Sequence, residues 1–151
     1  MKTVDEVAAL GGLLELAHDQ VGCRFLQDQL DLLNRTHIDL IFEAVKVDLV
    51  PLSMDPFGNY LVQKLLQYGT LEQRVELATL TANSLVGIAL NVHGTRVVQK
   101  MVEVAETEPQ ATAICEAIAP NIMQLILDMN GNHVVQVCRD RGLLMISVNC
   151  T

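Results

Sequence analysis

The chain has 151 residues, half of them apolar, and it carries a formal net charge of −8 and no tryptophan. This length suits one domain with a sizeable core, and no apolar run reaches the ~18 residues that a membrane span requires. The acidic balance argues against a generic nucleic-acid binder held by phosphate contacts. The N-terminal region has no basic lead-in beyond Lys2, so we expect no signal peptide and a cytoplasmic protein.

The cysteines and histidines give no sign of a metal site or an active site. No two cysteines form a Cys-x-x-Cys pair, and no cysteine and histidine cluster at zinc-ligand spacing. The cysteines are Cys23, Cys115, Cys138 and Cys150. His93 and His133 lack the oriented nucleophile or carboxylate that a catalytic pair needs. We therefore expect reduced thiols, no metal, no cofactor and no enzymatic activity.

The first third of the chain predicts helices separated by short breaks. These helices are expected over residues 5–17, 21–33, 37–45 and 47–54. Gly11-Gly12 weakens the first helix, and Asp19 caps the second. Pro51 lies inside the fourth, so that helix is either about one turn long or kinked there.

The remainder of the chain continues in the same way, and we expect no β-strands. Helices are expected over residues 55–69, 83–90, 92–105, 122–127 and 129–140, with two more starting at residues 70 and 107. Thr70-Leu-Glu-Gln73 and Thr107-Glu-Pro-Gln110 have the spacing of capping boxes, which mark helix N-termini.

The stretch Asp55-Pro-Phe-Gly-Asn-Tyr-Leu-Val-Gln-Lys-Leu-Leu66 shows how one of these helices is built. Asp55 is a good N-cap, and Pro56 suits the first helical position because its missing N–H is not needed there. On a helical projection one half of this helix is polar or aromatic and the other half is purely aliphatic. The aliphatic half predicts a core contact, and the polar half offers amides and a flat ring to a planar ligand.

The same pattern occurs four times. Glycines recur at Gly22, Gly58, Gly94 and Gly131, which are 36, 36 and 37 residues apart. The capping residues Asp19, Asp55, Asn91 and Asp128 precede them by three positions, and the glutamines Gln27, Gln63, Gln99 and Gln136 follow them by five. A fixed period of this size predicts a solenoid, in which each repeat buries its apolar face against its neighbours.

Gly-Asn-Tyr-Leu-Val-Gln-Lys and Gly-Asn-His-Val-Val-Gln resemble the helical repeat of the Pumilio (PUF) family of single-stranded-RNA-binding proteins. The resemblance runs from about Ala8 to Gly142 and is to repeats one to four of an eight-repeat array. It implies an all-α, right-handed superhelical solenoid of about four three-helix repeats. The implied partial domain spans 1–142, with repeats at about 8–43, 44–79, 80–115 and 116–142 and a non-repeat tail at 143–151.

The resemblance also implies that each repeat reads one base with two or three side chains. The implied base-edge residues are Cys23, Gln27, Asn59, Gln63, Thr95, Gln99, Asn132 and Gln136. The implied base-stacking residues are Arg24, Tyr60, Arg96 and His133. The pairs in repeats one and three resemble adenine readers and those in repeats two and four resemble uracil readers. Because such proteins run antiparallel to their RNA, the implied string is 5′-UAUA-3′.

By this resemblance, the chain is expected to bind messenger RNA 3′-untranslated regions and to repress transcripts through effector proteins, without a small-molecule substrate or a membrane. Two alternatives stay open. One is a helical-repeat scaffold for protein interactions, which would be expected to vary the residues at the four glutamine positions. The other is a PUF-derived fragment with little RNA affinity, because the fourth repeat lacks a closing helix and Leu143–Thr151 resembles no PUF repeat.

Overall fold

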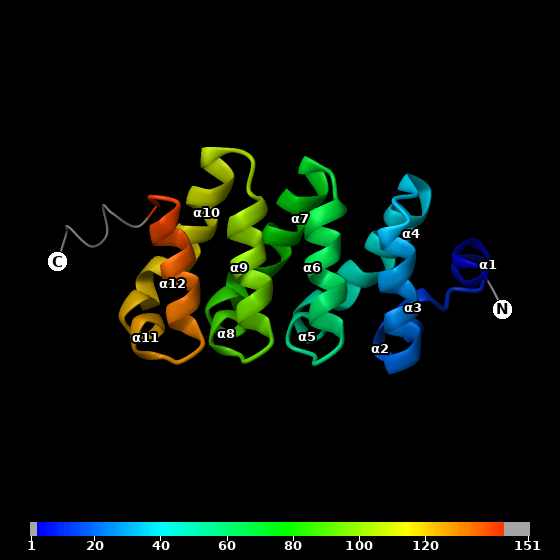
Figure 1. Cartoon of the computed structure of the whole chain (residues 1–151), viewed down its shortest axis with the longest axis horizontal. Coiled ribbons are helices and arrows are strands. Elements are labelled where there is room, and N and C mark those ends of the chain that lie inside the picture. Colours follow the sequence, from blue (N-terminus) through cyan, green and yellow to red (C-terminus); the bar gives the residue numbers. More distant parts are fainter. Residues whose placement is uncertain (1–2, 144–151) are drawn as a thin grey trace.

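The computed structural model describes residues 3–143 and consists of helices stacked side by side along one axis (Figure 1). The α-helices are α1 Val4–Ala9, α2 Leu13–His18, α3 Gln20–Asp31, α4 Arg35–Val45, α5 Leu49–Ser53, α6 Gly58–Tyr68, α7 Leu71–Thr81, α8 Leu85–Leu90, α9 Gly94–Val104, α10 Glu108–Ile118, α11 Ile122–Leu127 and α12 Gly131–Asp140. Short 3₁₀ segments Lys46–Asp48, Ala82–Ser84 and Ala119–Asn121 precede α5, α8 and α11. Residues 3–143 contain no strand, which confirms the all-α solenoid.

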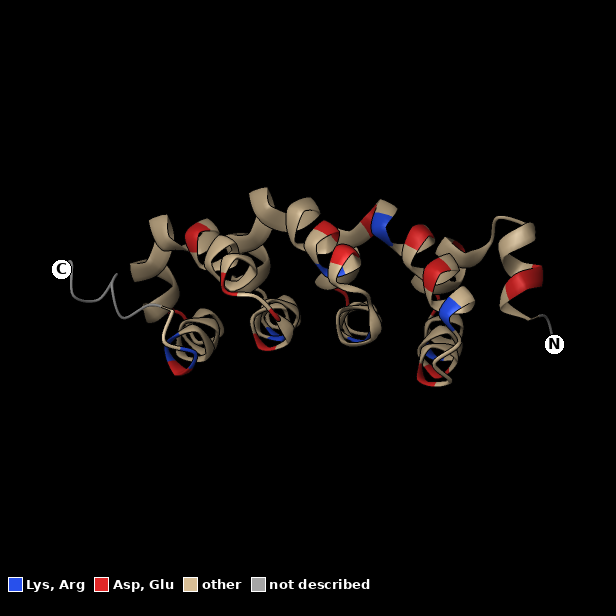
Figure 2. Ribbon diagram, turned by 90° about the horizontal axis from the view of Figure 1, so that it is seen from above, with Lys and Arg blue, Asp and Glu red and all other residues tan. Residues whose placement is uncertain are grey.

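Each of the first three repeats places a short helix, a long polar-faced helix and an outer helix in succession, as α5, α6 and α7 do, and the described part of the fourth repeat consists of the short helix α11 and the long helix α12. The four long helices α3, α6, α9 and α12 lie side by side in Figure 1, and Figure 2 shows them on the inner side of a gently bowed row. The outer helices α4, α7 and α10 lie behind them. None of the helices within residues 3–143 is long and apolar enough to cross a bilayer.

The capping residues act as the sequence predicts. Asp55 Oδ2 accepts hydrogen bonds from the backbone N–H groups of Phe57 and Gly58, at 2.8 and 2.7 Å. Its own backbone carbonyl accepts from the N–H of Asn59 at 3.1 Å. Asp19, Asn91 and Asp128 make the same side-chain bond to Gly22, Gly94 and Gly131. Each capping residue thus closes a turn. In the last three repeats the regular helix starts two or three residues later than predicted, at Gly58, Gly94 and Gly131, whereas α3 starts at Gln20, directly after its cap.

The four repeated glycines are required by close approach of the preceding short helix. A Cβ atom on Gly58 would lie 2.7 Å from the carbonyl oxygen of Leu52 in α5. On Gly22 it would lie 2.6 Å from the carbonyl oxygen of Leu16 in α2. Side chains larger than hydrogen would separate the two helices, so glycine sets the packing distance inside each repeat.

The aliphatic half of each long helix forms the core, as predicted. Leu61, Val62, Leu65 and Leu66 of α6 are at most 1% exposed. They belong to one continuous apolar cluster that runs from α1 to α12. Because every repeat packs its apolar side against its neighbours, the core is one continuous strip along the length of the stack.

Two predicted helices differ in detail, and the structure decides the alternative left open at Pro51 in favour of a helix about one turn long. The helix expected over residues 5–17 is two helices, because Gly11 adopts a positive φ of 71° that ends α1 before α2 begins. Around Pro51, the helix is one short turn-length segment, Leu49–Ser53. Thr107 caps α10, but the side chain of Gln110 bonds to the N–H of Glu106 instead of closing the box. The capping box at Thr70 is complete, and the predicted tail at 143–151 lies, except for Leu143, outside the described residues.

Candidate nucleic-acid interface

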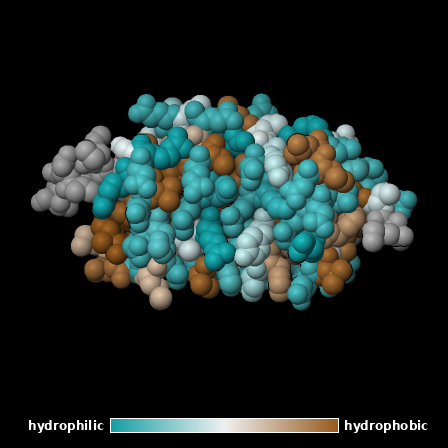
Figure 3. Space-filling view, in the orientation of Figure 1, coloured by the Kyte–Doolittle hydropathy of each residue, from teal (hydrophilic) through white to brown (hydrophobic). Residues whose placement is uncertain are grey.

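The twelve residues expected to contact bases all lie on the long helices α3, α6, α9 and α12. Figure 3 looks onto this face and shows mainly hydrophilic side chains across it, with apolar patches along its lower edge and at its upper right. The four flat or cationic side chains are exposed: Arg24, Tyr60, Arg96 and His133. The four glutamines are half-buried or exposed, and their partners Cys23, Asn59 and Thr95 are buried. The face therefore has a floor of small buried polar groups beneath exposed side chains.

Asn59 is fully buried and its amide is already bonded to the protein. Its Nδ2 donates to the carbonyl oxygens of Asp55 and Pro56, at 2.8 and 3.0 Å. Its Oδ1 accepts from Nε2 of Gln63 at 3.0 Å. Both amide hydrogens of Asn59 are used, so Gln63 is the member of the pair that can present a donor and an acceptor outward. In the fourth repeat, Asn132 makes the same two loop bonds, to the carbonyls of Asp128 and Met129.

The first and third repeats anchor their glutamines differently. Thr95 Oγ1 donates to the backbone carbonyl of Asn130, in the next repeat, at 2.9 Å, and it accepts from Gln99 Nε2 at 3.2 Å. Cys23 occupies the equivalent position, with its sulfur 3.5 Å from the carbonyl of Phe57 and from Gln27 Nε2. These hydroxyl and thiol groups therefore tie one repeat to the loop of the next.

Burial is the main reason that the pKa of the Cys23 thiol is raised above its usual value. The thiol stays protonated at neutral pH and acts as a hydrogen-bonding group, not as a nucleophile. No cluster of three or more histidine, cysteine or acidic side chains within residues 3–143 could hold a metal ion. The chemistry available on this face is hydrogen bonding and stacking.

Neighbouring repeats are also connected through their exposed side chains. Arg96 Nη1 donates to the hydroxyl of Tyr60 at 3.0 Å, which joins α9 to α6 across the surface. Arg24 instead makes a long 3.4 Å ion pair with Asp28 on its own helix. Both Arg24 and Tyr60 remain exposed to solvent. The guanidinium of Arg24 and the ring of Tyr60 are therefore available to stack against a flat ligand.

A hollow of about 390 Å³ lies between α3 and α6 and brings together Arg24, Gln27 and Tyr60. Its wall also includes Phe57, which is 43% exposed, and Val21, which is 78% exposed. The sequence analysis did not single out these two apolar residues. The sequence feature that could have identified them is an apolar side chain immediately before a repeated glycine, at a position outside the predicted core face.

A second, smaller hollow of about 160 Å³ lies on α12 and is lined by Asn132, Gln136 and Arg139 together with Ile126 and Val135. It brings the polar pair of the fourth repeat into one concavity. Five of the twelve predicted side chains thus lie in two separate hollows, one between the first and second repeats and one in the fourth.

One charged cluster lies at the edge of this face, between α3 and α6. Lys64 Nζ lies 2.6 Å from Asp31 Oδ2, and the hydroxyl of Tyr68 lies 2.7 Å from Asp31 Oδ1. The hydrogen bond from Lys64, followed by that from Tyr68, lowers the pKa of the Asp31 carboxyl. The Lys64 ammonium is thus balanced by a carboxylate, which reduces its attraction for a phosphate.

Comparison with known proteins identifies the repeat. The family model described as "Pumilio-family RNA binding repeat" matches residues 13–46, 48–79, 84–119 and 121–138. A Pumilio domain-containing protein of Schizosaccharomyces pombe is 40% identical over 129 residues, which cover 85% of this chain and 19% of that protein. Putative pumilio homolog 7, chloroplastic, of Arabidopsis thaliana is 47% identical over 128 residues, which cover 82% of this chain and 19% of the relative. The chain thus spans about a fifth of the length of these relatives.

Solved structures show the same architecture. PUF-8 in complex with PBE-RNA aligns with a TM-score of 0.88 and 31% identity, over 98% of this chain and 43% of that one. The Puf4 RNA-binding domain bound to the HO endonuclease RNA 3′ UTR recognition sequence aligns with a TM-score of 0.80 and 48% identity, over 83% of this chain and 39% of that one. With four repeat matches and these structural neighbours, the chain belongs to the Pumilio (PUF) family, whose proteins bind RNA and are not enzymes.

Proposed function

We propose that this chain binds single-stranded RNA selectively through the face formed by α3, α6, α9 and α12, with one base at each repeat. The observation that carries this proposal is the fourfold recurrence, in register, of a buried or half-buried polar anchor, a glutamine four residues later and an exposed flat or cationic side chain. A protein-interaction scaffold has no need to repeat these residue types at these positions. A surface that binds RNA does need this repetition, because the bases of RNA recur at a regular spacing.

The second repeat illustrates the proposed base contact. With one amide hydrogen bonded to Asn59, Gln63 retains one N–H donor and its Oε1 acceptor. Uracil presents a carbonyl acceptor beside its N3–H donor, so this glutamine amide complements its Watson–Crick edge. Asn59 then acts by fixing the glutamine in position, and it need not itself donate to the base.

The side chains between the glutamines would hold the bases by stacking. A base entering between Tyr60 and Arg96 would replace their direct hydrogen bond with contacts to its two faces. Stacking is available to every base, so it supplies affinity while the glutamine pairs supply choice. With Cys23–Gln27 and Thr95–Gln99 as adenine readers and Asn59–Gln63 and Asn132–Gln136 as uracil readers, the proposed string is 5′-UAUA-3′.

The affinity of this chain alone would be modest. Four stacked bases contribute about 4–12 kcal/mol at ~1–3 kcal/mol each, and association costs of similar size oppose them. The net charge of −8 leaves little room for compensation by phosphate contacts. We therefore expect a micromolar dissociation constant with a shallow dependence on salt. A chain with almost no affinity, as a piece of a longer array, is the second candidate because the chain covers only about a fifth of its relatives.

In the cell, the proposed role is binding to messenger RNA 3′-untranslated regions in the cytoplasm, with repression carried out by recruited effectors. The Puf4 structure, whose RNA is a 3′ UTR recognition sequence, motivates this assignment. The proposed repeat boundaries of about 8–43, 44–79, 80–115 and 116–142 assign one long helix to each base.

The test is fluorescence anisotropy of labelled RNAs ending in UAUA and UCUC at one fixed salt concentration, with sedimentation velocity on the same sample. A monomer that prefers UAUA supports the four-base reading. Equal binding of the two RNAs would refute the base assignments. Absence of binding by a folded chain would favour the low-affinity fragment.

A further inference from the structure

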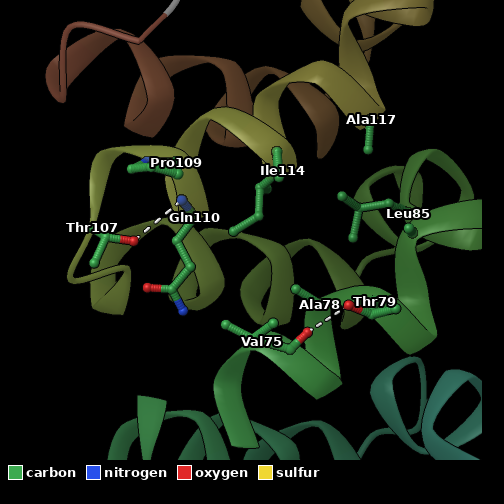
Figure 4. Close-up of a pocket in the computed structure, with 11 residues that line it drawn as sticks. Val75, Ala78, Thr79, Leu85, Thr107, Pro109, Gln110, Ile114 and Ala117 are labelled. Carbon is green, nitrogen blue, oxygen red and sulfur yellow. Dashed lines mark hydrogen bonds between the residues drawn. The ribbon is translucent and has the colours of Figure 1, made fainter. Parts of the chain in front are cut away.

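The outer face of the solenoid carries an apolar groove that RNA recognition does not use. It lies between α7 and α10, has a volume of about 420 Å³ and is lined mainly by alanine, valine, leucine and isoleucine (Figure 4). The two threonine hydroxyls drawn in its wall are already bonded within the chain. Thr79 donates to the carbonyl of Val75 at 2.8 Å, and Thr107 accepts from the N–H of Gln110 at 3.3 Å. The groove therefore offers apolar surface and few free polar groups.

The preceding pair of outer helices, α4 and α7, forms an equivalent hollow of opposite chemistry. It is lined by Phe42 and by charged or polar side chains, among them Asp39, Glu43 and Glu76. Lys46 crosses it, with its Nζ 2.7 Å from Glu43, 2.8 Å from Glu76 and 5.4 Å from the centre of the Phe42 ring. In this position the protein bridges its own repeats with an ion-pair network.

The two hollows correspond residue by residue along the repeat. On the first wall, Asp39, Phe42, Glu43 and Lys46 become Val75, Ala78, Thr79 and Ala82, each 36 residues later. On the second wall, Glu76 becomes Ala113, 37 residues later. The bridging groups are thus all replaced at once, and the second hollow keeps its size while losing its charges and its aromatic ring. Core packing accounts only for the change at Phe42, which is 2% exposed. Asp39 and Glu43 are exposed and Lys46 is half-buried, so packing does not explain the loss of the charged side chains.

The helices that form the apolar groove are acidic, chiefly on the α10 side. Segments 70–84 and 105–121, which include α7 and α10, hold five glutamates and one arginine. The arginine, Arg74, is itself bonded to Glu106. Glu108 and Glu116 of α10 are exposed, whereas Glu72 and Glu76 line the hollow between α4 and α7. Figure 2 shows acidic residues along the outer helices. An apolar groove with an acidic rim complements an apolar segment with basic flanks.

We propose that the groove between α7 and α10 binds a basic amphipathic helix of a partner protein. Two or three apolar side chains of that helix, about one turn apart, would lie against Ala78, Ala82 and Ala113, and its lysine or arginine side chains would face the glutamate rim. The groove lies on the opposite side of the solenoid from α3, α6, α9 and α12, so a partner and RNA can bind together. This assignment does not depend on the RNA-binding proposal.

The test is selection of random 16-residue displayed peptides on the immobilised chain, followed by anisotropy with a labelled synthetic copy of the enriched peptide. We expect enriched peptides to be cationic, with apolar residues at i and i+4. The decisive variant is Ala78→Phe with Ala82→Lys and Ala113→Glu, which installs the equivalents of Phe42, Lys46 and Glu76 from the first hollow without changing net charge. It should weaken the peptide at least about tenfold, as loss of a well-packed anchor does.

A second pair of variants separates groove binding from effects on folding. Glu116→Lys on the rim should weaken the peptide several-fold, whereas Glu15→Lys, an equal charge change on an exposed residue of α2, should not. Circular dichroism verifies that each variant folds. The proposal is overturned if cationic amphipathic peptides are not enriched, if the two charge variants behave alike, if UAUA RNA displaces the peptide, or if a second copy of the chain occupies the groove in sedimentation velocity.

Discussion

Replacing Gly58 by alanine should destabilise the chain although alanine is the better helix former. The added Cβ would lie 2.7 Å from the carbonyl oxygen of Leu52, 3.0 Å from its Cδ2 and 3.2 Å from the Cβ of Asp55. Two of these atoms belong to α5, whose backbone would have to move away from α6. Because α5 is packed into the continuous core, this movement cannot be confined to one flexible side chain.

The magnitude follows from two opposing terms. Gly→Ala favours a helix by up to ~1 kcal/mol, and overpacking of a well-filled contact costs ~1–3 kcal/mol. The steric term is the larger, so Gly58→Ala should lower the free energy of unfolding by about 1–2 kcal/mol. For a chain of this size that corresponds to a melting temperature lower by roughly 2–8 °C.

Gly87 provides a matched control within the same chain. It lies inside α8, is exposed, and an added Cβ would have nothing within 4 Å. Gly87→Ala should therefore raise the free energy of unfolding by about 0.5–1 kcal/mol through helix propensity alone.

Urea unfolding followed by circular dichroism measures both variants against the unsubstituted chain. Opposite signs for Gly58→Ala and Gly87→Ala are the expected result. If Gly58→Ala proves as stable as the unsubstituted chain, the close approach of α5 does not explain the repeated glycine. If Gly87→Ala also loses stability, propensity is not the term that separates the two sites.

Four further predictions concern the interface and its supports. Tyr60→Ala should weaken binding of UAUA RNA by about 5- to 150-fold, the loss of one stacked base at ~1–3 kcal/mol, and Tyr60→Phe should keep most of that affinity. Asn59→Ser with Gln63→Glu should move the preference of one position from uracil towards guanine in anisotropy with single-base RNA variants. Arg74→Ala should cost about 1.5–3 kcal/mol in urea unfolding, because its guanidinium bonds the carbonyl ends of α6 and α9. Asp31→Asn should lower stability at pH 7, because the pKa of Asp31 is lowered in the folded chain; its contribution is present above the usual carboxyl pKa of ~3.9 and is lost as the pH falls through the lower folded value.

Each of these predictions has a control or a contradicting result. Tyr60→Phe binding as weakly as Tyr60→Ala would place the contribution in the hydroxyl and not in the ring. An unchanged base preference would remove Asn59 and Gln63 from the base code. Arg24, whose side chain is 77% exposed against 13% for Arg74, is the control for an arginine with little structural role. A difference between Asp31→Asn and the unsubstituted chain that persists at pH 2 would mean that ionisation of Asp31 is not its source.

The repeat could be predicted from sequence because its signals are local. A capping side chain and the N–H group it bonds lie three residues apart, so spacing alone identified Asp55 and Thr70. The same spacing placed the regular helix too early at Asp55, since a capped turn precedes it. The single helix expected over residues 5–17 was wrong because apolar periodicity continues through Gly11, whose positive φ interrupts the backbone.

Long-range features could not be predicted in this way. Sequence places Asn59 on the polar side of its helix, yet it is fully buried, because the preceding loop folds back and its carbonyls bond the amide. Phe57 and Val21 join the hollow between α3 and α6 only when two repeats stack. The apolar groove between α7 and α10 likewise becomes visible only when consecutive outer helices are compared in register.

Base choice and repeat stability are coupled at the residue that follows each repeated glycine. The side chain there anchors its helix to a loop in one of two ways. Asn59 bonds the loop of its own repeat through the carbonyls of Asp55 and Pro56. Thr95 instead bonds the loop of the next repeat through the carbonyl of Asn130. Either version also fixes the glutamine one turn later.

Recoding a repeat therefore exchanges one bonding pattern for another. In Asn59→Ser the two loop carbonyls lose an amide donor, a cost of about 1 kcal/mol for each hydrogen bond. The serine hydroxyl would stand where Thr95 stands in the third repeat, and its equivalent acceptor is the carbonyl of His93. If that bond forms, the variant gains a tie between the second and third repeats and recovers part of the loss. A recoded repeat should then change its dependence on the following repeat as well as its base. Urea unfolding of Asn59→Ser against Asn59→Ala tests this: the serine variant should be more stable by about 1 kcal/mol if its hydroxyl bonds the carbonyl of His93, and equal stability would contradict the bond.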